Sequence, residues 1–279
     1  MTAPPPILTA HLFEELDDRL IALLESLSPS EWQHATIVPA WNVKQIAAHL
    51  LDTALRRLSF DRDGDTPSQP PIRNDRELAA VVNGMNARGV EIYGGLSAHV
   101  LIALMRFATR ELHEHFLSLD PDAPARFGVS WAGEAQSAAW FDIAREYTER
   151  WHHQQQIRLA VNQPGIMTPR LYKPVLDCFM RALPYTYRGV DAQPGAIALL
   201  RVDGEAGGDW FLERQHDGWA LMSEDSGAGR IVSTTTIPEE IAWRIFTKGI
   251  DRRSARERVT ITGDEQIGAA VLGSIAIIA

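Results

Sequence analysis

A change in hydrophobic periodicity near residue 188 constrains the fold of this chain more than any other feature. Before that point, apolar residues recur at the three- and four-residue spacing of amphipathic helices. After it, short apolar runs are separated by Gly and Asp, as in strands joined by hairpins. One pattern cannot serve both structures, because helices and strands present side chains with different periods. The sequence therefore predicts a helical domain over residues 1–188 and a smaller α+β domain over residues 189–279.

The helical domain is predicted to begin each of its main helices at a recognisable cap. Asn42 precedes the apolar pattern of the second helix, and Ser97 is placed to cap the second helix of a longer region. A polar, proline-rich loop is expected over residues 61–74. The predicted helices cover residues 9–27, 43–60, 137–161 and 169–187, with two more inside 75–119.

The second domain is predicted to mix strands with short helices. β-branched and aromatic residues gather in brief runs that Gly and Asp interrupt. The predicted strands cover residues 196–202, 210–214, 219–223, 230–235 and 259–262, and the predicted helices cover residues 238–247 and 264–278.

Cysteine content and hydropathy bear on the compartment. Cys178 is the one cysteine of the chain, so no intrachain disulfide can form, which fits a reducing environment. It lies in an apolar helical stretch and is expected to be a core residue. No apolar run reaches the length of about 18 residues that a membrane helix needs, and the first ten residues lack a signal-peptide pattern. We therefore expect a cytoplasmic protein without membrane segments.

The charge balance argues against nucleic-acid binding. The formal net charge is −9, and basic residues are mostly scattered among acidic ones. A basic cluster over residues 252–258 is interrupted by Glu257. Because a nucleic-acid partner usually requires a continuous basic face, we expect none.

A pair of polar residues in the 137–161 helix has the spacing of metal ligands. Glu149 and His153 are four residues apart, which places both side chains on one helical face. His49, inside the predicted 43–60 helix, is the best candidate for a third ligand. The alternative is that Glu149 and His153 form an ordinary solvent-exposed contact between neighbouring turns.

A second pair with the same spacing competes with the first. Glu111 and His115 are also four residues apart, so spacing alone does not rank the two pairs. At about 100° per residue, His49 and His153 both stand away from the apolar stripes of their helices. Each therefore faces solvent or a polar cavity. Phosphate-binding loops, nucleophile elbows and C-x-x-C motifs are all absent from the sequence.

Two stretches resemble a known family. Residues 39–50, Pro-Ala-Trp-Asn-Val-Lys-Gln-Ile-Ala-Ala-His-Leu, and residues 149–158, Glu-Arg-Trp-His-His-Gln-Gln-Gln-Ile-Arg, are similar to the DinB-like superfamily. Within it they resemble the mycothiol-dependent maleylpyruvate isomerase family. Segments of the second domain, such as residues 181–184, 204–210 and 261–264, look like that family's sterol-carrier-like domain.

The resemblance implies a fold and a metal site. It implies a DinB-like four-helix bundle in which His49, Glu149 and His153 bind a divalent metal, most often zinc, followed by a smaller α+β sterol-carrier-like domain. Glu111 and His115 would then be a surface pair. This chain has Gln156 where family members often have an acidic residue, so the support of the second histidine is expected to differ.

The resemblance also implies a function. Three protein ligands leave an open metal position, where mycothiol or a similar small thiol would be activated to attack an electrophilic substrate, giving isomerisation or thiol transfer. Arg244 and Lys248 of the second domain are candidates for a catalytic cation that faces the metal across a domain cleft. Alternatives are a non-catalytic protein that binds metal and small ligands, and a hydrolase that uses zinc-bound hydroxide. The partners expected are small molecules, and the oligomeric state is open.

Overall fold

The structure is a computed structural model that describes residues 3–67, 72–223 and 229–277. Its contacts divide the chain into two compact units. The helical unit comprises Leu8–Arg126 and Ala138–Ile166, and the sheet unit comprises Met1–Ile7, Phe127–Ser137 and Met167–Ile277. Mixed helical and sheet architecture is therefore as the sequence predicts.

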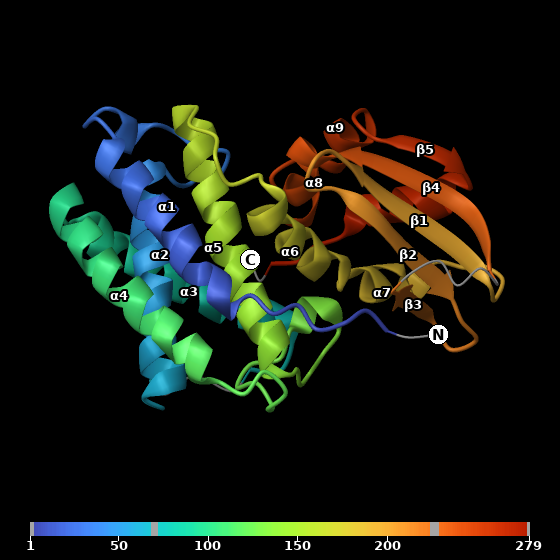
Figure 1. Cartoon of the computed structure of the whole chain (residues 1–279), viewed down its shortest axis with the longest axis horizontal. Helices are drawn as coiled ribbons and strands as arrows, with labels where there is room; N and C mark the ends of the chain where they lie inside the picture. Colours follow the sequence, from blue (N-terminus) through green and yellow to red (C-terminus); the bar gives the residue numbers. More distant parts are fainter. Residues whose placement is uncertain (1–2, 68–71, 224–228, 278–279) are drawn as a thin grey trace. The chain divides into compact units, whose positions relative to one another are not determined.

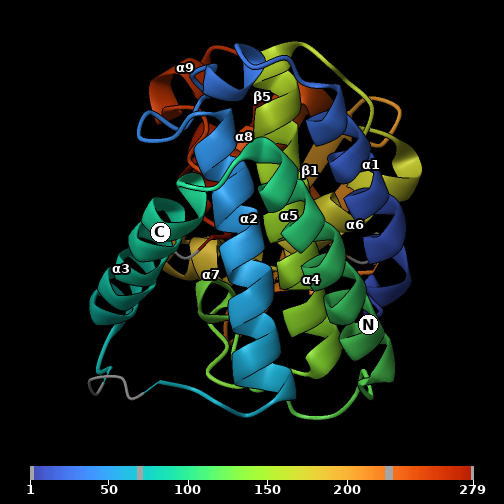
Figure 2. The same cartoon turned by 90° about the vertical axis from the view of Figure 1, so that its left-hand side faces the viewer.

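The helical unit is built around helices that lie side by side (Figures 1 and 2). Helices α1 and α2 each contact both α4 and α5, and α3 packs on α2. The bounds are α1 (Phe13–Ser26), α2 (Val43–Arg57), α3 (Asp75–Gly94), α4 (Ala98–Ser118) and α5 (Ala139–Val161). Short 3₁₀ turns precede α1 and α2, at Ala10–Leu12 and Glu31–Gln33, and a π-helical turn, Leu58–Arg62, extends α2.

Side-chain caps explain where the helices begin. The Asn42 side chain accepts a hydrogen bond from the Gln45 amide, and the Gln45 side chain accepts one from the Asn42 amide, which closes a capping box at α2. Ser97 accepts from Val100 at the start of α4. Both predicted caps are thus confirmed. Helix α5 ends at Asn162, whose left-handed backbone (φ 54°) stops the helix.

The core of the helical unit surrounds α5. The ring of Phe13 lies 4.9 Å from that of Phe116 and 5.5 Å from that of Tyr147, and all three are fully buried. Every residue from Arg150 to Arg158 is buried, whatever its polarity. Because a helix buried all round cannot turn its polar side chains to water, those side chains must find partners inside the unit.

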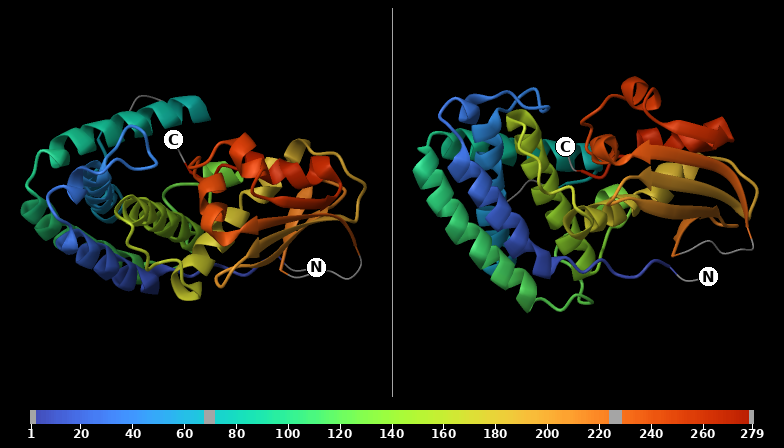
Figure 3. Two further views of the ribbon diagram at one scale, coloured as in Figure 1. Left: turned by 90° about the horizontal axis from the view of Figure 1, so that it is seen from above. Right: turned by 45° about the horizontal axis from the view of Figure 1, so that its top comes forward.

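The sheet unit contains a mixed five-stranded sheet in the order β3-β2-β1-β4-β5. Strands β1 and β4 are parallel and the other neighbouring pairs are antiparallel. Helices of the same unit pack beside the strands (Figure 3). The strands are β1 (Ala196–Asp203), β2 (Gly208–Arg214), β3 (Trp219–Met222), β4 (Arg230–Pro238) and β5 (Thr260–Gly263). The helices are α6 (Pro169–Met180), α7 (Leu183–Thr186), α8 (Glu239–Phe246), α9 (Arg252–Arg256) and α10 (Glu265–Ala269).

Helix α6 packs with the sheet although its sequence pattern placed it in the helical domain. The Tyr172 hydroxyl donates to the Glu239 carbonyl and accepts from the Trp243 amide, both in α8. The Trp210 indole of β2 donates to Asp177 of α6 at 2.9 Å. The compact units thus part near residue 166, before α6. A folding boundary near residue 188 stays a prediction, which limited proteolysis can test.

Three predicted helices after residue 168 differ in extent from those observed. The 169–187 helix is interrupted after Met180, because Pro184 has no amide hydrogen to continue the bonding. The 238–247 helix ends at Phe246. The 264–278 helix ends at Ala269 and continues as a 3₁₀ turn, Ala270–Gly273; its last predicted residue, 278, lies outside the described residues.

Helix α9 was not predicted. Its residues are polar apart from Ala255, so it shows no apolar period, and it depends on Asp251, which caps the Ser254 amide. Within the described ranges, none of the helices combines the length and hydropathy needed to cross a lipid bilayer.

Candidate metal centre

The start of α2 positions His49. The capping box sets the first turn of the helix, and His49 lies two turns further on, only 1% exposed. The indole ring of Trp41, which is half-buried just before the helix, lies 4.8 Å from the His49 ring and 6.1 Å from the His153 ring. The tryptophan therefore packs beside both imidazoles and restricts their orientation. Sequence reasoning noted Trp41 as part of a motif but assigned it no contact.

Helix α5 brings the other two side chains to the same point. Oε1 of Glu149 lies 3.2 Å from Nε2 of His49 and 3.1 Å from Nε2 of His153. One ligand atom from each of the three residues lies within 4.8 Å of the others. Among the described residues, this is the group of three His, Cys, Asp or Glu side chains whose ligand atoms lie this close together. The predicted convergence of His49, Glu149 and His153 is therefore observed.

Burial and mutual contact shift the pKa values of this cluster. Burial lowers the pKa of His49 to about 4 and that of His152 to about 3, so both imidazoles are neutral near pH 7. Burial by itself would raise the pKa of Glu149, but His153 and His152 beside it hold the pKa well below its usual range. Neutral imidazoles and an ionised carboxylate are the states that bind a cation.

Gln156 supports His153 from the next turn of α5. Nδ1 of His153 lies 2.8 Å from Oε1 of Gln156. When that amide oxygen accepts, Nδ1 carries the proton and the lone pair of Nε2 faces Glu149 and His49. The glutamine thus holds the imidazole from the position where the resemblance led us to expect an acidic residue.

We expect Gln156→Leu to lower metal affinity by roughly 10- to 100-fold, because the hydrogen bond that fixes the imidazole is lost. Competition with a coloured chelator would measure the change. Gln155→Leu is the matched control, since Gln155 is also buried on α5 but its Oε1 has no hydrogen-bond partner among the described residues. Equal affinities for the two variants would contradict the role of Gln156.

The donor set and its surroundings fit a divalent metal. Two imidazoles and one carboxylate suit zinc and other first-row metals. Nδ1 of His49 is buried and has no hydrogen-bond partner in the described part of the chain. Such an unpaired buried polar atom costs free energy of folding and is often found at functional sites. The neighbouring ionic side chains carry an excess of two negative charges that a divalent cation would balance. They are two arginines, Arg57 and Arg145, and four acids, Asp61, Asp142, Glu146 and Glu149.

The second Glu–His pair is not the exposed pair that was expected. His115 is buried, and its Nε2 lies 2.8 Å from Oδ2 of Asp61. Glu111 instead pairs with Arg62 at 3.1 Å. The two side chains thus have separate partners, because the π-helical turn after α2 brings Asp61 and Arg62 against α4.

Alanine at both Glu111 and His115 is expected to leave metal content unchanged. Stability should nevertheless fall by about 1–3 kcal/mol, because Asp61 loses a buried hydrogen-bond partner. Elemental analysis and urea unfolding would measure the two effects. A loss of metal as large as that caused by His153→Ala would mean that the wrong pair had been assigned.

The two predicted cations of the sheet unit do not share a helical turn. Helix α8 ends at Phe246, and Lys248 follows it with a left-handed backbone (φ 57°). The Gly249 amide donates to the Arg244 carbonyl at 2.8 Å, which closes the helix as a Schellman motif does. The Arg244 side chain donates to the Gly249 carbonyl at 3.0 Å, while Lys248 is exposed.

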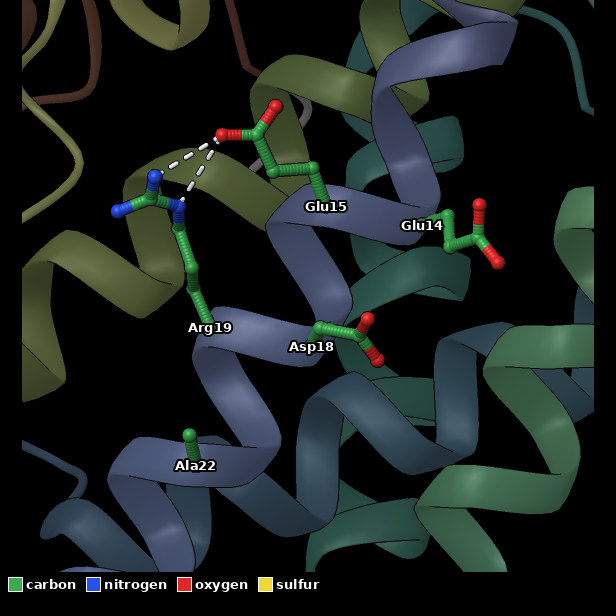
Figure 4. Close-up of a pocket in the computed structure, with 5 residues that line it drawn as sticks. All are labelled: Glu14, Glu15, Asp18, Arg19 and Ala22. Carbon is green, nitrogen blue, oxygen red and sulfur yellow. Dashed lines mark hydrogen bonds and ion pairs between the residues drawn. The ribbon is translucent and has the colours of Figure 1, made fainter.

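Among the described residues of the helical unit, two of the hollows bear on the site. One, of about 520 Å³, is lined by Trp41, Lys44 and Gln45 of α2 and its approach and by Glu91 of α3, among others. It is lined by Trp41, whose ring packs beside both imidazoles, but by none of the three cluster residues. The other, of about 490 Å³, lies along one face of α1, where Arg19 pairs with Glu15 (Figure 4). It contains none of the three cluster residues.

The fold and the cluster together define a class: a helix-plus-sheet protein whose helical unit carries a His–Glu–His group of metal-ligand type. Residues 13–158 match the family described as the mycothiol maleylpyruvate isomerase N-terminal domain. The chain belongs to this family, as the resemblance of its two motifs implied.

Solved structures support the fold. The crystal structure of the mycothiol-dependent maleylpyruvate isomerase, in the form of a histidine-to-alanine mutant, is similar with a TM-score of 0.54 and 12% identity, over 91% of this chain and 92% of that chain. The unmutated isomerase gives a TM-score of 0.50 and 11% identity over the same shares. At such identities the likeness concerns the fold. No curated protein sequence matches the chain.

Proposed function

We propose that this protein is a metal-dependent enzyme that activates a small thiol, mycothiol or a close analogue, for addition to an electrophilic substrate. Addition followed by bond rotation and elimination gives cis–trans isomerisation, whereas addition alone gives thiol transfer. The observation that carries the proposal is the convergence of His49, Glu149 and His153 in a chain of this family. Zinc is the metal that we propose, on the chemistry of the donors.

The chain's own side chains would prepare the site. Glu149 supplies the negative charge, and Gln156 holds the His153 ring so that Nε2 faces the cluster. Trp41 covers the two imidazoles on one side. A divalent metal held there would lower the pKa of a thiol at its open position. Cys178 is buried in α6 and is no substitute for that thiol.

Access for small molecules is consistent with the hollow beside Trp41. Its volume of about 520 Å³ lies in the range of small-molecule sites. We also propose that the helical unit is a DinB-like four-helix bundle and that the sheet unit is sterol-carrier-like. We further propose that the protein is cytoplasmic, that its partners are small molecules, and that it binds no nucleic acid.

Elemental analysis combined with a thiol-dependence assay tests the proposal. We expect about one equivalent of metal per chain, and isomerisation of maleylpyruvate or thiol conjugation that requires both the metal and mycothiol. Turnover that needs metal but no thiol would favour the hydrolase. Small-ligand binding that survives chelation, without turnover, would favour a carrier protein.

Arg244 and Lys248 remain proposed as catalytic cations. Replacing each with Met should leave metal content unchanged and lower thiol-dependent kcat/KM at least tenfold, about 1.4 kcal/mol of transition-state stabilisation. The comparison of the two variants matters, because Arg244 also closes the end of α8 whereas Lys248 is exposed. Unchanged turnover in both would leave the sheet unit without this role.

A further inference from the structure

An ionic network between α2 and α5 places an arginine beside the exposed side of the His–Glu–His cluster. Arg145 precedes Glu149 by four residues and therefore lies one turn away on the same face of α5. The side chain of Arg145 is 17% exposed and that of Glu149 is 28% exposed, whereas His49 is only 1% exposed. Glu149 and Arg145 thus lie on one face of α5, and both side chains are partly exposed to solvent.

The guanidinium of Arg145 is held in place by two carboxylates. Oδ1 of Asp142 lies 3.2 Å from Nε and 2.6 Å from Nη2, and Oε1 of Glu146 lies 2.8 Å from Nη2. Asp142 is shared, because its other oxygen accepts from Arg57. Within the described residues these contacts occupy Nε and Nη2 and leave Nη1 without a protein partner. The planar group is therefore oriented while one of its nitrogens stays available.

Arg145 keeps its charge in this environment. Burial by itself lowers its pKa, but the carboxylates of Glu146, Asp142 and Glu149 raise the pKa above the ordinary value. A charged and pre-oriented guanidinium suits recognition of a carboxylate, since its available nitrogen can donate a charge-assisted hydrogen bond and little rotamer freedom remains to be lost.

We propose that Arg145 selects substrates, by binding the carboxylate of a small acidic molecule whose reacting group lies at the His–Glu–His cluster. This inference rests on the proposed function, because it needs a metal at the cluster. It assigns the specificity to the helical unit itself, where one helical turn determines the spacing between Arg145 and Glu149.

The other arginines of α5 are engaged elsewhere. Nε of Arg150 lies 2.9 Å from Oδ1 of Asp17, and Nη2 of Arg158 donates to the Arg19 carbonyl at 2.9 Å. Arg145 lies outside the 149–158 motif but one turn before Glu149 on the same face of α5.

Two thiols of equal length test the proposal without turnover. The protein is loaded with Co²⁺, and the dissociation constants of 3-mercaptopropionate and 3-mercapto-1-propanol are measured from the thiolate-to-cobalt absorption. We expect the wild type to bind the acid at least about tenfold more tightly than the alcohol, and Arg145→Gln to reduce that preference to less than about twofold. Arg145→Lys, which keeps the charge but not the planar group that Asp142 and Glu146 orient, should retain part of the preference.

Arg150→Lys is the matched control, since it alters a buried arginine of the same helix that faces Asp17. It should keep the full preference. An unchanged preference in Arg145→Gln would overturn the inference and leave the proposed function intact. Absence of the absorption with both thiols in the wild type would overturn the proposed function, and this inference with it. If Arg145→Gln does not fold, Arg145→Lys replaces it in the test. A preference of Arg145→Lys for the acid over the alcohol that equals the wild-type preference would then overturn the inference.

Discussion

Replacing His153 by alanine is expected to lower metal affinity by more than about 100-fold and to abolish thiol-dependent turnover. A variant of this kind removes one of three donors that meet at a single point, so that the remaining two cannot hold a divalent ion with the same geometry. His49→Ala and Glu149→Gln should have effects of the same order. Elemental analysis after dialysis and competition with a chelator would measure the loss.

Thermal unfolding provides a second measurement of the same effect. Added metal should raise the Tm of the wild type, because a ligand that binds only the folded state stabilises it by about 2.7 kcal/mol at a concentration 100 times its Kd. The Tm of the His153 variant should not respond. A metal-dependent shift equal to that of the wild type would place the metal elsewhere in the chain.

Replacing Arg57 by methionine is expected to destabilise the protein by about 3–5 kcal/mol, because Asp142, Asp61 and Glu146 each lose one of their partners in a buried network. Arg57 is 6% exposed, donates to Asp142, and lies 3.2 Å from Asp61 and 3.9 Å from Glu146. Urea unfolding of the metal-free protein would report the change as a lower midpoint with an unchanged slope.

Arg110→Met is the control for Arg57→Met. Arg110 pairs with Glu111 at 3.1 Å, but its side chain is 64% exposed, and surface pairs contribute little. Its replacement should change stability by less than about 0.5 kcal/mol. Similar midpoints for the two variants would contradict the inference that the buried network stabilises the helical unit.

The Arg57 effect should depend on pH. Burial by itself raises the pKa of Asp142, but Arg145 and Arg57 lower it below its ordinary value of 3.8. A carboxyl whose pKa is lower in the folded chain than in the unfolded chain binds fewer protons when folded. Its contribution to stability is therefore present at pH values above the ordinary pKa of 3.8 and is lost as the pH falls through the folded-state pKa. The difference between wild type and Arg57→Met should therefore narrow below about pH 4.

Local patterns were sufficient for much of the fold. The capping residues Asn42 and Ser97 begin α2 and α4 as predicted, because a side-chain cap depends only on residues within one turn. The strand and hairpin pattern after residue 188 likewise corresponds to β1, β2 and β3. The end of α6 and the separate α7 were missed, although Pro184 was a signal in the sequence.

The candidate site was predictable only in part. The spacing of Glu149 and His153 placed them on one face, and the family resemblance selected His49 as their companion over the competing Glu111–His115 pair. Nothing in the local pattern indicated that His115 would be buried against Asp61, because that contact joins residues 54 positions apart. The same holds for the contact of Arg57 with Asp142, across 85 positions.

The sequence by itself determined most of the helices and strands, the caps of α2 and α4, and the helical face on which Glu149 and His153 lie, because each depends on residues a few positions apart. Only the tertiary structure decided which helices meet, that Trp41 packs on both imidazoles, that α6 belongs with the sheet, and that Arg145 is held with one nitrogen available. The physical reason is that burial and charge pairing depend on what lies across the interface between elements. Side chains from distant positions must supply the hydrogen bonds that water no longer gives, and their identity is a property of the packed chain.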